Sequence, residues 1–238
     1  MSKRAIIILK VLTHLLCLAP LAWLIHLFTS GRLETYADPV NYITHYTGDW
    51  TIYILLASLS ITPIRRLWPS IAFLIRFRRL IGLYAFFYAT LHLAIFVFLF
   101  SGYDIETAFT GLRAGHPGVL VTQFRLILPG MVHDVLNRRF IQVGLLAWLL
   151  LLALACTSPA FIMRAMGGKN WQRLHRLVYL AAIAGVVHYW WLVKVGNRSP
   201  WKDTVVLTIL LLARIIYSAI KRFKKPAPTA LRSGSVSS

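Results

Sequence analysis

Four of the eight histidines lie inside long apolar runs, where an ionisable side chain is costly and is a functional candidate by default. They are His14, His92, His175 and His188. A neutral imidazole can be buried without net charge, and it is a frequent ligand of metal ions and of haem iron. Any one of them could instead make a plain hydrogen bond between helices, so their arrangement matters more than their presence.

The depth of these histidines along the apolar runs is the useful comparison. His92 lies 12 residues after Leu80, where the third run begins, and His188 lies 13 residues after His175, where the fifth begins. If both runs are helices that enter from the same side, the two side chains lie at one depth, roughly 18–20 Å from that side. Two imidazoles at one level on two helices are what bis-histidine ligation of a haem iron in a bundle requires.

The other two histidines do not share this level. His175 lies at the boundary of its run, where the nearest positions on the third run hold Arg78 and Arg79. On an ideal helix, His175 would also point about 140° away from His188. His14 lies about 14 Å into the first run and could reach either level. We therefore take His175 as a further axial-ligand candidate and His14 as the weakest one.

The elements that hold these residues are long and apolar. Of the 238 residues, 58% are hydrophobic and 14% are charged, whereas about a quarter of a soluble domain is charged. The apolar residues gather in runs of roughly 20, the length of helix that crosses a ~30 Å hydrocarbon core. This excludes an ordinary soluble enzyme, a disordered chain and a secreted disulfide scaffold. We predict an all-α polytopic membrane protein with six transmembrane helices, at residues 5–28, 48–63, 80–101, 140–158, 174–193 and 204–220.

The charges indicate how these helices are oriented. Six spans put both termini on one side, and that side carries many basic residues and no acid. The basic residues are Lys3, Arg4, Arg65, Arg66, Arg76, Arg78, Arg79, Arg164, Lys169, Arg173, Arg176, Lys221, Arg222, Lys224, Lys225 and Arg232. An excess of Lys and Arg marks the cytoplasmic side. We therefore expect a bacterial inner-membrane protein with cytoplasmic termini, and we read the net charge of +19 as orientation rather than as nucleic-acid binding.

Two segments lie outside the predicted spans. The outer loop 102–139 contains an apolar stretch, but Arg125, Pro129, His133 and Asp134 interrupt it, and a seventh crossing would put the basic tail outside. We predict an amphipathic helix on the outer surface there instead. We divide the chain into a membrane domain at 5–222 and a basic, serine-rich, disordered cytoplasmic tail at 223–238.

Several kinds of site are excluded by missing motifs. Cys17 and Cys156 form no CxxC or CxxCH motif, so neither a zinc ribbon nor a covalent c-type haem is expected. The chain has no GxGxxG motif and no room for a nicotinamide or flavin-reductase domain. If it transfers electrons, we expect it to take them from one partner and give them to another.

The sequence resembles a known family of membrane proteins over about residues 5–222. The similar motifs, in chain order, are Gly48-Asp-Trp-Thr, Thr62-Pro-Ile-Arg-Arg, Arg79-Leu-Ile-Gly-Leu-Tyr-Ala-Phe-Phe-Tyr-Ala-Thr-Leu-His, Thr157-Ser-Pro, Trp171-Gln-Arg-Leu-His-Arg-Leu-Val-Tyr and His188-Tyr-Trp-Trp. They are similar to the ferric-reductase-like transmembrane domain and, more closely, to the MsrQ (YedZ) family. Each motif is short, and it is their order and topology together that make the resemblance specific.

The resemblance implies a haem b subunit of a protein-methionine-sulfoxide reductase system, with FMN also associated with the family. Such a subunit takes electrons from the quinone pool, or from a cytosolic flavin reductase, and passes them to MsrP. MsrP is a periplasmic molybdopterin enzyme that repairs oxidised proteins, and the two form a heterodimer. The chain would thus be an electron-transfer subunit rather than the catalytic one. By position, His92, His175 and His188 match the haem-associated histidines of the family.

The basic residues Arg76, Arg78, Arg79 and Arg173 have two readings. They either set the topology and meet lipid head groups, or they form a landing site for a quinol, a flavin phosphate or haem propionates. We carry Arg78, Arg79 and Arg173 as cofactor-binding candidates.

The chain departs from ferric reductases and NADPH oxidases in one respect. Those proteins hold two stacked haems with two histidines on each of two helices, whereas the third helix here has only His92. A second haem would need His175 and an unusual partner such as His14. Two alternatives stay open: a ferric reductase or quinol-linked cytochrome b that serves another periplasmic enzyme, and a non-redox transporter or assembly factor with structural histidines.

Overall fold

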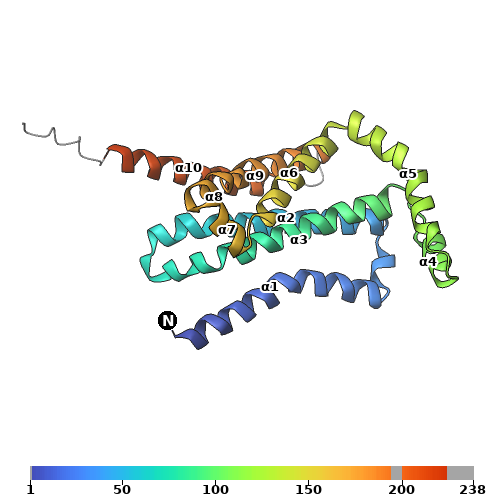
Figure 1. Ribbon diagram of the computed structural model, residues 1–238, viewed down its shortest axis with the longest axis horizontal. Coiled ribbons are helices and arrows are strands. Elements are labelled where there is room, and N and C mark those ends of the chain that lie inside the picture. The colour runs from blue at the N-terminus through green and yellow to red at the C-terminus, as the bar shows by residue number, and fades with distance from the viewer. Residues whose placement is uncertain (1, 194–199, 224–238) are drawn as a thin grey trace, which may run out of the picture.

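The computed structural model describes residues 2–193 and 200–223, and every regular element in these residues is helical (Figure 1). The α-helices are α1 (Lys3–Thr29), α2 (Pro39–Leu67), α3 (Arg78–Ile95), α4 (Ile105–Arg113), α5 (Gly118–Asn137), α6 (Arg139–Cys156), α7 (Ala160–Met166), α8 (Gly168–Leu174), α9 (Leu177–Leu192) and α10 (Trp201–Phe223). Two 3₁₀ segments, η1 (Arg32–Thr35) and η2 (Pro69–Arg76), and a π-helical end of α3, η3 (Phe96–Phe100), complete them. The all-α prediction is confirmed for the described residues.

Local sequence explains where two of these helices begin. The Asp38 carboxylate accepts a hydrogen bond from the Asn41 N–H, and Pro39 occupies the first turn of α2, where its missing N–H costs nothing. In the same way the Asp104 carboxylate caps α4 by accepting from the Thr107 N–H and hydroxyl. These hydrogen bonds, that of the hydroxyl first, stabilise the charged form and lower the pKa of the Asp104 carboxyl below its usual value.

Among the described residues, five helical segments are long and apolar enough to cross a membrane: Lys3–Thr29, Arg78–Phe100, Gly118–Asn137, Arg139–Cys156 and Trp201–Lys221. Four of them match predicted spans. The fifth, α5, was excluded by the sequence analysis, yet by length and composition it qualifies, because its charged residues are outweighed by apolar ones. The predicted spans in α2 and α9 do not qualify, since α2 is interspersed with polar side chains and α9 has only 16 residues.

The helices form an elongated bundle with α4 and α5 lying across one end (Figure 1). The helices α1, α2, α3, α6, α9 and α10 run along the long axis, and both Lys3 and Phe223 lie toward the end opposite α4 and α5. The closest packing joins α2 to α3 and α6 to α9. Leu59, Ala85 and Ala181, each at most 1% exposed, form part of the core between these four helices.

Some predicted boundaries were wrong. The second helix begins at Pro39 rather than at residue 48, because the Asp38 cap starts it earlier. The fifth begins at Leu177 rather than at 174, since the short helix α8 ends first and His175 lies between the two. The ideal-helix angle between His175 and His188 therefore does not apply. The predicted tail at 224–238 lies outside the described residues.

The first helix is attached to the bundle by hydrogen bonds around its internal proline. The fully buried Tyr88 hydroxyl donates to the Cys17 carbonyl (2.8 Å) and accepts from the Leu21 N–H (3.1 Å). The Tyr46 hydroxyl donates to the Pro20 carbonyl (3.0 Å). A proline inside a helix removes one backbone bond and disturbs the turn before it. These tyrosines bond to the disturbed turn, which matters because few side chains of α1 are buried.

We expect Tyr88→Phe to loosen α1 and to lower the unfolding free energy by about 1–3 kcal/mol, since it leaves buried backbone groups without their partner. Thermal unfolding of the purified protein in mild detergent measures this. The matched control is Tyr84→Phe, which removes a hydroxyl that contacts His14 on the same helix pair but is partly exposed. An equal loss in both variants would contradict the special role of Tyr88.

Candidate functional site

The structure brings together the two histidines that the sequence places at one depth. The rings of His92, on α3, and His188, on α9, have centroids 6.1 Å apart and planes inclined by 82°. A metal–imidazole bond is about 2 Å long, so two rings that share one metal ion have centres roughly 6 Å apart. The pair is thus arranged as two axial ligands of one ion would be.

Each of these rings is oriented by a backbone carbonyl of a neighbouring helix. His92 Nδ1 lies 2.9 Å from the Thr44 carbonyl oxygen on α2, and His188 Nδ1 lies 2.7 Å from the Phe140 carbonyl oxygen on α6. A carbonyl oxygen can only accept, so each Nδ1 must carry the hydrogen. In the neutral ring, Nε2 then keeps its lone pair and is free to act as a ligand.

Two glycines let the rings approach those helices so closely. A Cβ atom added to Gly48 would lie 3.3 Å from the His92 ring, and one added to Gly144 would lie only 2.6 Å from His188 Nδ1. The second distance is below any normal contact, so residue 144 must be glycine for the His188 ring to stay where it is. The sequence analysis missed Gly144, although a lone glycine inside an apolar helix, which costs about 1 kcal/mol, is a signal of close approach.

His175 lies away from this pair. It stands between α8 and α9, 11 residues before the His188 position as counted from the first residue of α9, or about 16 Å along that helix. Its ring stacks on Trp171 with centroids 3.8 Å apart, and its Nε2 is 3.2 Å from the Thr157 hydroxyl. The positive charge of Arg78 acts on it. His175 therefore belongs to the end of the bundle that carries η2.

The remaining candidate residues are dispersed. Arg79 donates from Nη1 to the Ser158 carbonyl oxygen (3.2 Å), and Arg173 is exposed on α8. The Nδ1 atom of His14 lies 2.7 Å from the Tyr84 hydroxyl. Among the described residues the ring contact given for His14 is with Tyr84, so it does not supply His175 with a second imidazole.

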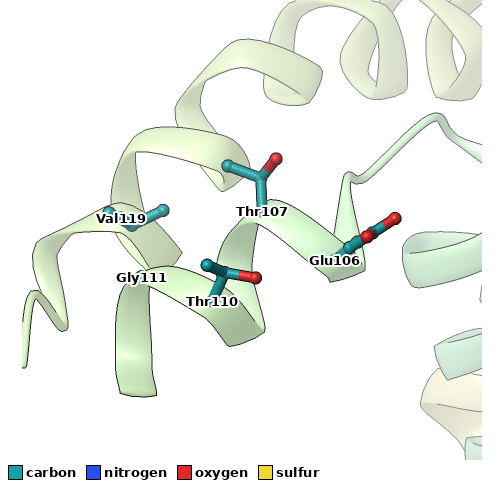
Figure 2. A pocket seen from close by; sticks show the side chains of 5 residues that line it. All are labelled: Glu106, Thr107, Thr110, Gly111 and Val119. Atoms are coloured by element: carbon teal, nitrogen blue, oxygen red, sulfur yellow. The ribbon is translucent and has the colours of Figure 1, made fainter. Parts of the chain in front are cut away.

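A hollow at the joint of α4 and α5 is separate from the histidines. Figure 2 shows its lining, which comprises Glu106, Thr107, Thr110, Gly111 and Val119. A Cβ atom on Gly111 would lie 2.8 Å from the Val119 side chain, so this glycine allows the two helices to meet. The hollow holds one carboxylate and two hydroxyls and none of the candidate ligands.

Comparison with known proteins identifies the family. The family described as ferric reductase like transmembrane component matches residues 47–186, which include His92 and end two residues before His188. A protein of Herminiimonas arsenicoxydans is 40% identical over 194 residues, which is 80% of this chain and 78% of the relative. It is described as the heme-binding subunit MsrQ of protein-methionine-sulfoxide reductase. The chain belongs to the MsrQ family.

Other members of the MsrQ family align over still more of the chain. A protein of the same description from Xanthomonas oryzae pv. oryzae is 40% identical over 214 residues, covering 88% of this chain and 87% of the relative. One from Ralstonia nicotianae is 36% identical over 217 residues, covering 90% and 86%. No solved structure matches. Family membership and the apolar helices together make the chain an integral membrane protein.

The glycine contacts lead to a prediction for stability. We expect Gly144→Ala to force the His188 ring off the Phe140 carbonyl and to lower the unfolding free energy by about 1–3 kcal/mol, as overpacking does. Gly48→Ala should have a smaller effect, because its added Cβ meets the His92 ring at a longer distance. Thermal unfolding in detergent measures both.

The matched control is Gly185→Ala on α9, where an added Cβ meets nothing within 4 Å. That change should be neutral or should stabilise by about 0.5–1 kcal/mol, because alanine favours helix. If Gly144→Ala were as harmless as Gly185→Ala, the close contact with His188 would not exist in solution.

Proposed function

We propose that the protein is a haem b membrane subunit that carries electrons across the bacterial inner membrane to a periplasmic molybdopterin methionine-sulfoxide reductase of the MsrP type. The observation that supports this best is the pair His92 and His188, whose Nδ1 atoms are held by backbone carbonyls and whose Nε2 atoms are left as ligands. The described MsrQ relatives, each a heme-binding subunit by name, point the same way.

The residues present fit a haem. His92 and His188 would hold the iron, and Gly48 and Gly144 would keep their rings in place. Bound haem supplies one-electron redox chemistry through its iron. The chain contributes two neutral ligands and burial among four helices, which excludes water. It would be an electron-transfer subunit, with MsrP as the catalytic partner in a heterodimer.

We infer a topology in which α1, α2, α3, α6, α9 and α10 cross the membrane and both termini are cytoplasmic. The common direction of these helices in Figure 1 supports six crossings. The crosswise α4 and α5 fit an outer, periplasmic surface better than a crossing. The basic residues of η2, α7, α8 and the end of α10 favour a cytoplasmic position for the opposite end.

Electrons would enter at the cytoplasmic end from the quinone pool or from a cytosolic flavin reductase. His175, Arg78, Arg79 and Arg173 lie at that end and could receive a quinol or the phosphate of FMN, a cofactor suggested by the resemblance to the family. His175 is the candidate ligand for a second haem, but it would need a partner other than His14, whose ring contacts Tyr84.

We expect the purified wild type to show a b-type reduced-minus-oxidised absorbance spectrum, and His92→Ala and His188→Ala to lose it, since either change removes an axial ligand. His175→Ala should keep the spectrum of the main site. A partial loss of haem in His175→Ala would reveal a second haem. A wild type that stays colourless after haem is supplied would refute the electron-transfer function and favour a transporter or assembly factor.

The identity of the acceptor needs a separate test. In proteoliposomes with a reduced quinol, or with a cytosolic flavin reductase and its substrate, we expect wild type to drive methionine-sulfoxide reduction by added MsrP, and His188→Ala to fail. Reoxidation of the haem by MsrP, followed by absorbance, measures the same step. Rapid reoxidation by ferric chelates together with none by MsrP would instead identify a ferric reductase.

A further inference from the structure

Buried polar atoms without hydrogen-bond partners gather where the end of α2 meets α10. Among the described residues, the structure leaves three such side-chain atoms: Thr62 Oγ1, Arg65 Nε and Arg214 Nε. Thr62 is only 6% exposed. Most buried polar side-chain atoms in proteins have a partner, so a group of three unpaired ones needs a specific explanation.

A proline on α2 holds one of these arginines in place. Pro63 has no N–H, so the Leu59 carbonyl, four residues earlier, receives no hydrogen bond from it. Arg214 Nη2 donates to that carbonyl instead (2.5 Å), and Arg214 Nη1 donates to the Tyr179 hydroxyl. The guanidinium is thus fixed beside Thr62, with its Nε still unused.

Several positive charges lie around Arg214. The charges of Arg66 and Arg78 act on it. Arg66 also stacks over the ring of Tyr217 at 3.8 Å, one turn beyond Arg214 on α10, which joins the two helices again. Arg65 follows Thr62 at a spacing of three residues, which places both on one face of α2. We call Thr62, Arg65, Arg66, Arg78 and Arg214 the α2–α10 cluster.

The protein has no carboxylate that could neutralise this cluster. Its sequence contains no Asp or Glu at 50–103, at 135–202 or after 203. The only acids on the two helices are Asp49 and Asp203, which precede Arg65 by 16 residues and Arg214 by 11 residues. Along a helix these spacings correspond to about 24 Å and 16 Å. Partly buried positive charges without a counter-charge are costly, so an anion from outside the chain would stabilise them.

We propose that the α2–α10 cluster binds a phosphate ester, with the guanidinium groups and the Thr62 hydroxyl as donors. Planar guanidinium groups match phosphate oxygens and bind them with strong, charge-assisted hydrogen bonds. Basic pockets between membrane helices, near one surface, are typical sites for anionic lipid head groups. The phosphate belongs either to an anionic phospholipid or to a small soluble ester. The site does not depend on the electron-transfer function.

The test compares purified full-length protein in nanodiscs of neutral phosphatidylcholine with nanodiscs that also contain phosphatidylglycerol. We expect phosphatidylglycerol to raise the melting temperature of the wild type. Arg65→Gln and Thr62→Val should weaken this response, with half-saturation at about tenfold more lipid, as expected for the loss of one hydrogen bond to a charged group. The matched control is Arg164→Gln, which removes an exposed positive charge on α7.

Thr62→Val separates binding from folding. If Thr62 had only a structural role, replacing its unpaired buried hydroxyl with a methyl group would leave the protein as stable or more stable at every lipid composition. A reduced lipid response in a variant that melts normally in phosphatidylcholine therefore supports the site. Arg65→Gln breaks no hydrogen bond that the structure gives to its Nε, so it too should fold.

A second arm identifies the source of the phosphate. Inorganic phosphate is titrated into the neutral nanodiscs, and a shift that depends on Arg65 and Thr62 would support the site and assign it to a soluble ester. A shift with phosphatidylglycerol alone would support the site and assign it to a lipid. The proposal is overturned if neither probe shifts the wild type, or if Arg164→Gln loses the response as fully as Arg65→Gln and Thr62→Val.

Discussion

The hydrogen bond from a buried imidazole to a helix carbonyl is the interaction on which the rest of this structure depends. His92 bonds the Thr44 carbonyl of α2 from α3, and His188 bonds the Phe140 carbonyl of α6 from α9. These bonds join the same helix pairs that pack most closely. Each bond fixes one tautomer, so the packing of the helices also decides which nitrogen of each ring is available as a ligand.

Prolines inside two helices are accommodated by the same physical means. Near Pro20 the hydroxyl of Tyr88 bonds to the disturbed turn of α1, and at Pro63 the guanidinium of Arg214 bonds to the carbonyl that the proline leaves without a donor. In lipid, water cannot satisfy such backbone groups, so a neighbouring helix must do so. The prolines thereby create specific contacts between helices, and the second one anchors a positive charge inside the bundle.

Much of the candidate site could be predicted from the sequence, because depth along a helix follows from residue count. Counting from the ends of the third and fifth apolar runs placed His92 and His188 at one level, and the rings are indeed 6.1 Å apart. The early start of α2 and the break before α9 were missed, since a capping side chain and a short preceding helix decide them locally. Hydropathy also did not separate α5 from a crossing helix, because composition carries no direction.

The sequence by itself determined the helical class, the membrane location and the family, because apolar run length, motif order and the scarcity of acids are written in the chain. Only the tertiary structure decided which carbonyl orients each histidine, that residue 144 must lack a side chain beyond hydrogen, and that Arg214 reaches the proline of α2. These are contacts between helices far apart in sequence. Their distances depend on how the helices pack, and no local pattern specifies that packing.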